Sequence, residues 1–168
     1  YWTEGNRGVG WGAGVTPTLK GGSKLGIASP PAVWRVGHTA GEAIARPSLK
    51  AGERLQGFRS DWTDLGSRDG ARWKMIGNAV SVPVAEWIGK GLAAPKATVD
   101  VDTRSLSAGE RWPVAAASIR GSRQAWQLSE RPLAKRPPHS LAAMLSEYGV
   151  YPLSFGAANG FYTRLRSS

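Results

Sequence analysis

The sequence of 168 residues contains no cysteine and only two histidines, His38 and His139. Without cysteine the chain has no disulfide framework, no cysteine-based zinc site and no cysteine nucleophile. Two histidines far apart in the sequence do not make a metal cage, and neither has a serine or carboxylate partner at a recognisable motif spacing. We therefore expect no structural metal and no acid–base role for either histidine.

Long apolar stretches are also missing from this chain. No run approaches the roughly 18 apolar residues that suggest a membrane-spanning helix, and the first residues lack the basic-then-apolar order of a secretion signal. These absences favour a soluble, cytoplasmic protein with no membrane partner. The chain starts at Tyr1 rather than at methionine and ends abruptly at Arg166-Ser167-Ser168, which suggests a fragment or a processed product.

Acidic residues are few. Twelve Asp and Glu stand against 22 Lys and Arg, so the formal net charge is +10. This balance is typical of proteins that bind a polyanion, although it does not identify which one.

Glycine is concentrated at the start of the chain, where residues 1–26 hold eight of the 22 glycines. This density predicts loops rather than regular elements. The spacing of Gly8, Gly10, Gly12 and Gly14 does not match the dinucleotide-binding pattern G-x-G-x-x-G, and no strand is predicted before it. A Rossmann-type phosphate loop is therefore rejected here.

Regular elements are predicted from residue 32 onward. A short apolar run at 32–36 indicates a strand, and Ser48 is placed to cap a short helix that stops at Gly57. A loop is expected to about residue 72, followed by an amphipathic helix over 81–92. Residues 93–96 have the composition of a linker, and residues 142–145 belong to another short helix.

Three stretches in this order resemble the distal half of the DNA (cytosine-5) methyltransferase family. Thr16-Pro17-Thr18-Leu19-Lys20-Gly21-Gly22 is similar to the end of its target-recognition region. Residues 46–58, ending Glu53-Arg54-Leu55-Gln56-Gly57-Phe58, are similar to its ninth motif, and residues 73–80, Trp-Lys-Met-Ile-Gly-Asn-Ala-Val, to its tenth.

The resemblance implies an α/β family fragment: a mixed, loop-rich small recognition lobe, plus a helix that packs on a Rossmann-like lobe absent from this chain. It implies a recognition segment at 1–45, a segment completing the methyltransferase domain at 46–92, a linker at 93–97 and an extension of unknown function at 98–168. The implied partners are double-stranded DNA and either the missing amino-terminal catalytic lobe or a separate subunit. A bacterial or phage-type, nucleoid-associated protein is expected.

The implied reaction is transfer of a methyl group from S-adenosylmethionine to C5 of cytosine. In this family the target base is flipped out of the helix, and a cysteine in a Pro-Cys loop adds to it. That loop is absent here, so the chain alone is expected to be inactive.

By resemblance, the cofactor pocket is shared with the missing lobe and includes Gly77, Asn78, Ala79 and Val80. Glycine lets the backbone approach a ligand, and an amide side chain can donate and accept hydrogen bonds. The structural alternatives are that Asn78 caps the following helix and that Val80 packs in the core.

The candidate DNA contacts share a position on or beside the glycine-rich loops: Arg7, Thr18, Lys20, Lys24 and Arg35. Cations there can neutralise phosphates, and a threonine hydroxyl can donate to a phosphate oxygen. The alternatives are solvated surface charges and, for Thr18, a turn hydroxyl bonded to its own backbone.

A third group is expected to be architectural: Arg46, Glu53, Arg54, Gln56 and Gly57. In the family this motif braces the recognition lobe, and an arginine fork suits bridging carbonyls and carboxylates. The family usually has a glutamate three residues before the position of Arg54, where this chain has Ala51, and Glu53 stands nearby.

One alternative from a different class stays open. The chain could be a self-sufficient basic nucleic-acid-binding module without enzymatic role, using glycine-rich loops and tryptophans such as Trp11, Trp34 or Trp62 on DNA or RNA.

Overall fold

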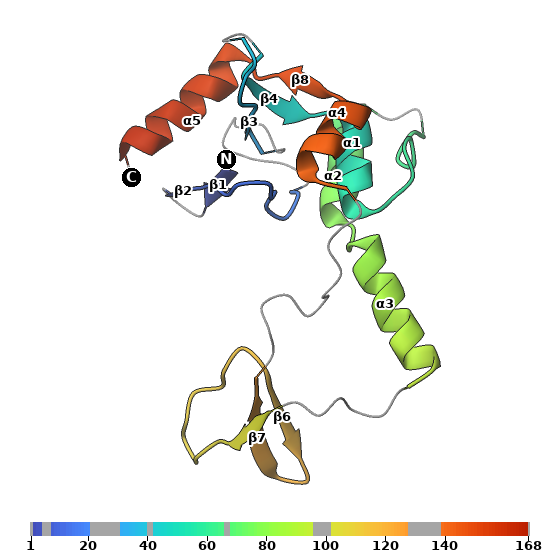
Figure 1. Cartoon of the computed structure of the whole chain (residues 1–168), viewed down its shortest axis with the longest axis vertical. Coiled ribbons are helices and arrows are strands. Elements are labelled where there is room, and N and C mark those ends of the chain that lie inside the picture. Colours follow the sequence, from blue (N-terminus) through green and yellow to red (C-terminus); the bar gives the residue numbers. More distant parts are fainter. Residues whose placement is uncertain are drawn as a thin grey trace. The chain divides into compact units, whose positions relative to one another are not determined.

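The computed structural model describes residues 2–4, 8–20, 31–39, 42–65, 68–95, 102–127 and 139–167. The chain forms two compact units, one made of residues 1–90 with 139–168 and the other of residues 91–138. The first unit contains helices and strands, and the second contains a small sheet. The chain as a whole is a mixed α/β protein with small sheets (Figure 1).

The first unit contains two small antiparallel sheets. Strands β1 (Trp2–Glu4) and β2 (Gly8–Gly10) form a hairpin, and β3 (Val33–Trp34), β4 (Ile44–Pro47) and β8 (Val150–Pro152) form a sheet in the order β3-β4-β8. The strand at 32–36 is thus confirmed in shortened form. The prediction of loops without a strand at the start of the chain is wrong, because pairing between β1 and β2 outweighs the weak strand propensity of glycine.

Three helices follow β4 in sequence: α1 (Leu49–Gln56), α2 (Asp69–Asn78) and α3 (Val82–Ala93). Helix α1 begins and ends as predicted, since the Ser48 hydroxyl accepts from the Ala51 N–H and Gly57 ends it in the left-handed conformation with φ of 90°. The helix predicted over 81–92 is confirmed as α3. The loop predicted up to residue 72 is wrong in its last part, where α2 already begins.

A compact core joins the start of the chain to α1 and α2. Its buried members are Leu19, Leu49, Trp73 and Ile76, with Leu55 packed against them. Tight helix contact is possible because of Gly52, where a Cβ atom would lie 2.7 Å from the Trp73 ring. The core therefore fixes the segment around Leu19 on the two helices.

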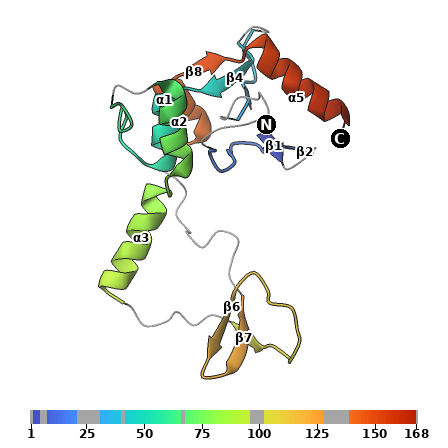
Figure 2. The ribbon, with the colours of Figure 1, turned by 180° about the vertical axis from the view of Figure 1, so that it is seen from behind.

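The last part of the chain returns to this unit. Helix α4 (Leu141–Tyr148) packs against α1, β8 pairs with β4 in the register Arg46 to Tyr151, and α5 (Phe155–Ser167) follows (Figure 2). The short helix predicted around 142–145 is confirmed as α4. The structure groups residues 139–167 with the first unit, whereas the sequence suggested one extension over 98–168.

The second unit contains a three-stranded antiparallel sheet of β5 (Thr103–Ser105), β6 (Ala116–Ile119) and β7 (Ser122–Trp126), in the order β5-β7-β6. Arg120 and Gly121 connect β6 to β7 and both have positive φ, 49° and 81°. Two residues of this conformation make the tight hairpin turn whose twist matches that of the strands.

No helix among the described residues is long and apolar enough to cross a membrane. Within the same ranges there is no group of three or more His, Cys, Asp or Glu side chains that could hold a metal.

Candidate cofactor and DNA-contact site

The four candidate cofactor residues lie at the carboxyl end of α2. Asn78 is the last residue of this helix, and the Ala79 N–H donates to the carbonyls of Met75 and Ile76 at 3.1 and 3.3 Å. Asn78 does not cap α3, which starts four residues later at Val82. Val80 has 71% of its surface exposed, so packing in the core of this chain is excluded for it.

An open hollow of about 500 Å³ lies beside the end of α2. It is lined by Ala71, Lys74, Met75, Asn78 and Ala79. The hollow thus contains two of the four candidate cofactor residues and adds a lysine that the sequence did not single out.

The turn after α2 is held by the end of α1. The Gln56 amide donates to the carbonyl of Ile76 at 2.9 Å and to that of Ala79 at 3.2 Å. Gly57 lies against the start of α3, since a Cβ atom at Gly57 would be 2.5 Å from Cδ of Pro83. Gln56, the last residue of α1, and Gly57, which follows it, therefore contact the chain before and after the turn that joins α2 to α3.

Glu53 is the centre of a buried polar network. Its carboxylate is fully buried and accepts hydrogen bonds from the N–H groups of Asp61 and Thr63, at 2.5 and 2.9 Å, and from the Thr63 hydroxyl at 2.5 Å. Arg72 of α2 donates to the same carboxylate at 3.1 Å and to the Thr63 hydroxyl at 3.1 Å. The network ties α1, the loop after it and α2 together.

The contacts of Glu53 set its protonation. Burial alone would raise the pKa of Glu53, but the hydrogen bonds from Thr63, Arg72 and the Asp61 backbone together lower it below the ordinary value. The pKa of Arg72 is raised, because the partner charge of Glu53 outweighs the burial that would lower it. Both groups are therefore charged at neutral pH.

The two arginines of the architectural group contact residues 148–151, which follow the second unit in the sequence. Arg54 lies over the Tyr148 ring at 5.3 Å and donates to the Phe58 carbonyl at 3.0 Å. Arg46 lies over the Tyr151 ring at 5.5 Å. Their contacts extend to α4 and β8, elements that the sequence did not connect to this motif.

The candidate DNA contacts are spread over the first unit. Thr18 and Lys20 are exposed on either side of the buried Leu19. Arg35 is half-buried and its N–H donates to the Ala43 carbonyl at 2.7 Å. Arg7 and Lys24 lie outside the described residues. Thr18 and Lys20 are thus held close together, whereas their contact with DNA stays a prediction.

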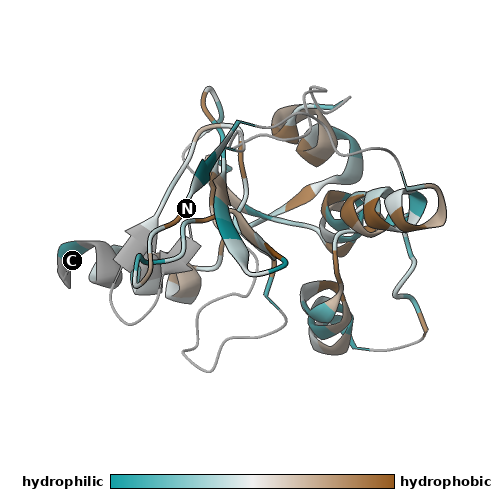
Figure 3. Ribbon diagram, turned by 90° about the horizontal axis from the view of Figure 1, so that it is seen from below, coloured by the Kyte–Doolittle hydropathy of each residue, from teal (hydrophilic) through white to brown (hydrophobic). Residues whose placement is uncertain are grey.

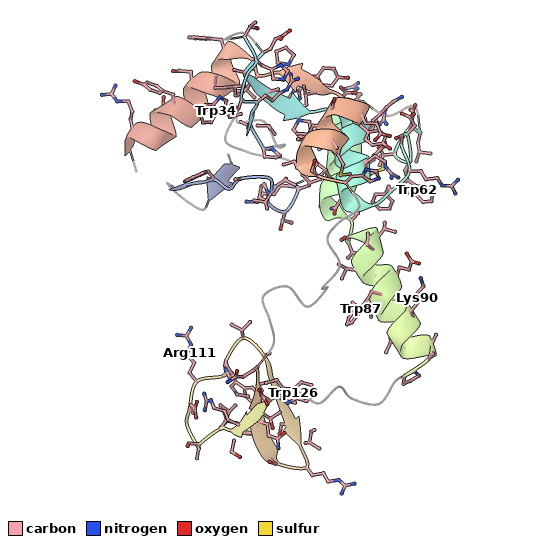
Figure 4. The ribbon with its side chains drawn as sticks, viewed as in Figure 1. Trp34, Trp62, Trp87, Lys90, Arg111 and Trp126 are labelled. Carbon is pink, nitrogen blue, oxygen red and sulfur yellow. The ribbon has the colours of Figure 1, made fainter. Side chains whose placement is uncertain are left out.

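Exposed tryptophans mark two further surfaces. Trp62, on the loop after α1, is stacked on Phe58 with 5.7 Å between the ring centres, and Trp87 projects from α3 (Figure 4). Trp87 is 63% exposed, and its apolar neighbours Val84 and Ile88 on α3 are exposed as well. The apolar face of α3 is therefore exposed as far as the described residues show, and Figure 3 gives the hydropathy of each residue.

Sequence reasoning did not find three residues on which the site depends. Thr63 and Arg72 complete the Glu53 network, and Gly52 allows α2 to approach α1. A lone threonine, and an arginine 19 positions after Glu53, match no sequence motif that would predict their contact with Glu53. Only the folded arrangement brings them together.

A family model and a relative of known sequence both match this chain. Residues 36–94 match the family model described as C-5 cytosine-specific DNA methylase. The Type II methyltransferase M2.BsuMI of Bacillus subtilis (strain 168) is 38% identical over 177 aligned positions, which cover 98% of this chain and 42% of that relative. No solved structure matches the chain. The chain spans less than half the length of that relative. Its residues 36–94 are similar to the C-5 cytosine-specific DNA methylases.

Proposed function

We propose that this chain is the distal portion of a DNA (cytosine-5) methyltransferase and contributes DNA contacts and part of the S-adenosylmethionine pocket. The main support for this proposal is that one core in the first unit contains residues of both the candidate DNA segment and the candidate cofactor segment. Leu19, whose neighbours Thr18 and Lys20 are exposed, packs with Trp73 and Ile76 of the helix that ends at Asn78. One rigid core thus holds both the segment suited to DNA and the segment suited to the cofactor.

The residues at the end of α2 fit the amino-acid end of S-adenosylmethionine. The Asn78 side chain is exposed at the hollow, and no group among the described residues bonds to it. Its amide can donate to a carboxylate and accept from an ammonium group. S-adenosylmethionine, when bound, supplies the methyl group, and the role of Asn78, Gly77 and Ala79 is to bind and orient it, with Val80 at the edge of the same pocket.

The DNA contribution rests on the exposed groups beside Leu19. A threonine hydroxyl and a lysine ammonium are donors that suit phosphate oxygens, and such contacts set the register of a protein on the duplex. Arg35, Arg7 and Lys24 add positive charge to the same segment of sequence. We propose that these residues position the DNA and that the other parts of the enzyme carry out the chemistry.

The missing lobe is proposed to cover α3. Val84, Trp87 and Ile88 form an uncovered apolar face on this helix, and exposed apolar patches on soluble proteins commonly mark interfaces. A Rossmann-like lobe carrying the Pro-Cys loop would bury this face and complete the pocket. Because the relative is named as a type II methyltransferase, we further propose a role in a restriction–modification system.

The test is reconstitution of the activity. The chain is purified together with the amino-terminal part of a family member that carries the Pro-Cys loop, and transfer of tritiated methyl groups to DNA is measured. We expect transfer by the pair and by neither part alone. Asn78→Ala should reduce transfer about tenfold, as the loss of roughly 1.4 kcal/mol of binding would, whereas the control Asn159→Ala, an exposed asparagine on α5, should have no effect.

The opposite outcome has a clear meaning. Tight DNA binding by the chain alone, with no transfer by the pair and no response to S-adenosylmethionine, would instead establish the stand-alone nucleic-acid-binding module.

A further inference from the structure

The carboxyl end of α2 contains backbone carbonyls that the helix itself cannot satisfy. The last carbonyls of an α-helix have no partner within the helix and need one from elsewhere. Here the residue after the helix, Ala79, is extended, with φ of −76° and ψ of 152°, so no glycine in the left-handed conformation closes the helix. The turn at 79–81 is therefore not held by the usual local capping arrangement.

Gln56 of α1 adds a partner from outside α2 to the bonds that the Ala79 N–H makes. Its side-chain amide donates to the carbonyls of Ile76 and Ala79, at 2.9 and 3.2 Å, one before and one after Asn78. A single NH2 group thus connects the two ends of the segment that contains Gly77 and Asn78. The bonds fix the distance between these carbonyls and with it the direction in which the Asn78 side chain leaves the backbone.

The neighbouring residue restrains the same turn from the side of α3. Gly57 has φ of 90°, and a Cβ atom on it would lie 2.5 Å from Pro83 Cδ and 3.2 Å from Val82 Cβ. The backbone of Gly57 therefore packs directly on the first turn of α3. Together, Gln56 and Gly57 hold the chain on both sides of residues 77–81.

We propose that Gln56 is a positioning residue for the cofactor: it orients Asn78 and its neighbours through the backbone and does not touch the ligand itself. This inference rests on the proposed function of the Asn78 segment. It gives Gln56 a role different from bracing the DNA-recognition segment, which the family resemblance implied. The reason is direct, since both hydrogen bonds of Gln56 go to the end of α2.

The first experiment examines the full chain without cofactor by hydrogen exchange. Gln56→Glu keeps the size of the side chain but replaces the donor with a carboxylate that faces two carbonyl oxygens. We expect the Ala79 N–H, which bonds to the Met75 and Ile76 carbonyls, to exchange at least about tenfold faster. The Thr63 N–H, held by Glu53, should exchange at the wild-type rate. Equal rates at Ala79 in the variant and the wild type would overturn the proposal, as would an equal acceleration at both amides.

The second experiment measures binding of S-adenosylhomocysteine by the chain paired with the catalytic lobe. Gln56→Glu should raise the Kd about tenfold and raise the KM for S-adenosylmethionine, with the Kd for DNA unchanged. Gln127→Glu, which makes the same change at an exposed position of the second unit, should change neither. If Gln56→Glu does not fold, Gln56→Met, which also lacks a donor but adds no charge, is measured in its place.

The outcomes separate the two proposals. If the wild-type pair neither binds S-adenosylhomocysteine nor methylates DNA, the proposed function is wrong. If the wild-type pair does both and the Gln56 variants bind S-adenosylhomocysteine as tightly, only the positioning role is wrong. A weaker affinity for DNA at unchanged affinity for S-adenosylhomocysteine would also overturn it, in favour of bracing of the recognition segment.

Discussion

At the scale of single residues, Glu53 is the buried charge at the centre of the network between α1 and α2. Its carboxylate accepts bonds from a helix side chain and from the loop after α1, and its charge is matched by Arg72. A buried charge is stable only when it is paired and hydrogen-bonded, and removal of one partner leaves the other without compensation. Glu53 therefore adds a charged link between α1 and α2 to the apolar core that they share.

Gln in place of Glu53 should lower the free energy of unfolding by about 3 kcal/mol, because Arg72 loses its buried partner. Chemical denaturation of the purified chain measures this change. Glu42→Gln, which alters an exposed glutamate, should change the stability by less than about 0.5 kcal/mol. Similar small effects of both substitutions would show that the network contributes nothing to stability.

The lowered pKa of Glu53 also predicts the direction of a pH effect. A carboxyl whose pKa is lower in the folded state stabilises the fold above its ordinary value of 4.5, and this contribution is lost as the pH falls through the lowered folded value. The stability difference between wild type and Glu53→Gln should therefore be largest near neutral pH and shrink in acid. A difference that grows as the pH falls below 4.5 would contradict this assignment.

At the scale of elements, the crossing of α1 and α2 depends on the absence of a side chain at Gly52. The Trp73 ring occupies the space that a Cβ atom would need, at 2.7 Å. Contacts this short force neighbouring side chains out of their preferred positions. The close packing of the two helices is what places the end of α2 within reach of Gln56.

Ala in place of Gly52 should destabilise the chain by about 1–2 kcal/mol, since the energetic cost of overpacking against Trp73 exceeds the stabilisation from the higher helix propensity of alanine. Thermal unfolding followed by circular dichroism would measure it. Gly89→Ala provides the matched control in α3, where a Cβ atom would meet nothing within 4 Å, and it should stabilise by about 0.5–1 kcal/mol. Stabilisation by both substitutions would mean that the Trp73 ring moves aside freely.

At the scale of the whole molecule, the chain returns after the second unit to complete the first. Ser48 is the point of contact: its hydroxyl donates to the Tyr148 carbonyl at 2.7 Å while it caps α1, and its N–H donates to the Gly149 carbonyl at 3.1 Å. Arg46 and Arg54 lie over Tyr151 and Tyr148. Residues far apart in the sequence are thus parts of one folded unit.

Ala in place of Ser48 should cost about 2 kcal/mol, because the helix cap and the bond to Tyr148 are lost together. Ser140→Ala removes only a cap, that of α4, and should cost about 1 kcal/mol or less. Denaturant titration of the two variants compares them directly. Equal losses would show that the bond from Ser48 to Tyr148 adds no stability to the unit.

The local elements of this protein could be predicted from the sequence because their signals are local. Ser48 and Gly57 mark the ends of α1 through their own backbone preferences, and the apolar spacing of residues 80–92 predicts α3. Helix α2 was partly missed because its amphipathic pattern is weak and its start, at Asp69, has no side-chain cap. The hairpin of β1 and β2 was missed because pairing depends on a partner strand rather than on composition.

The sequence by itself determined the similarity to the C-5 cytosine-specific DNA methylases, through three stretches in a fixed order that include the Gly77-Asn78 segment. It also determined the boundaries of α1 and α3, since these depend on neighbours within a few positions. Only the tertiary structure decided that Gln56 bonds to both sides of that segment, that Arg72 meets Glu53, and that β8 pairs with β4. These contacts join residues 19 to more than 100 positions apart. Their partners are selected by packing and burial in the folded chain, which no local pattern records.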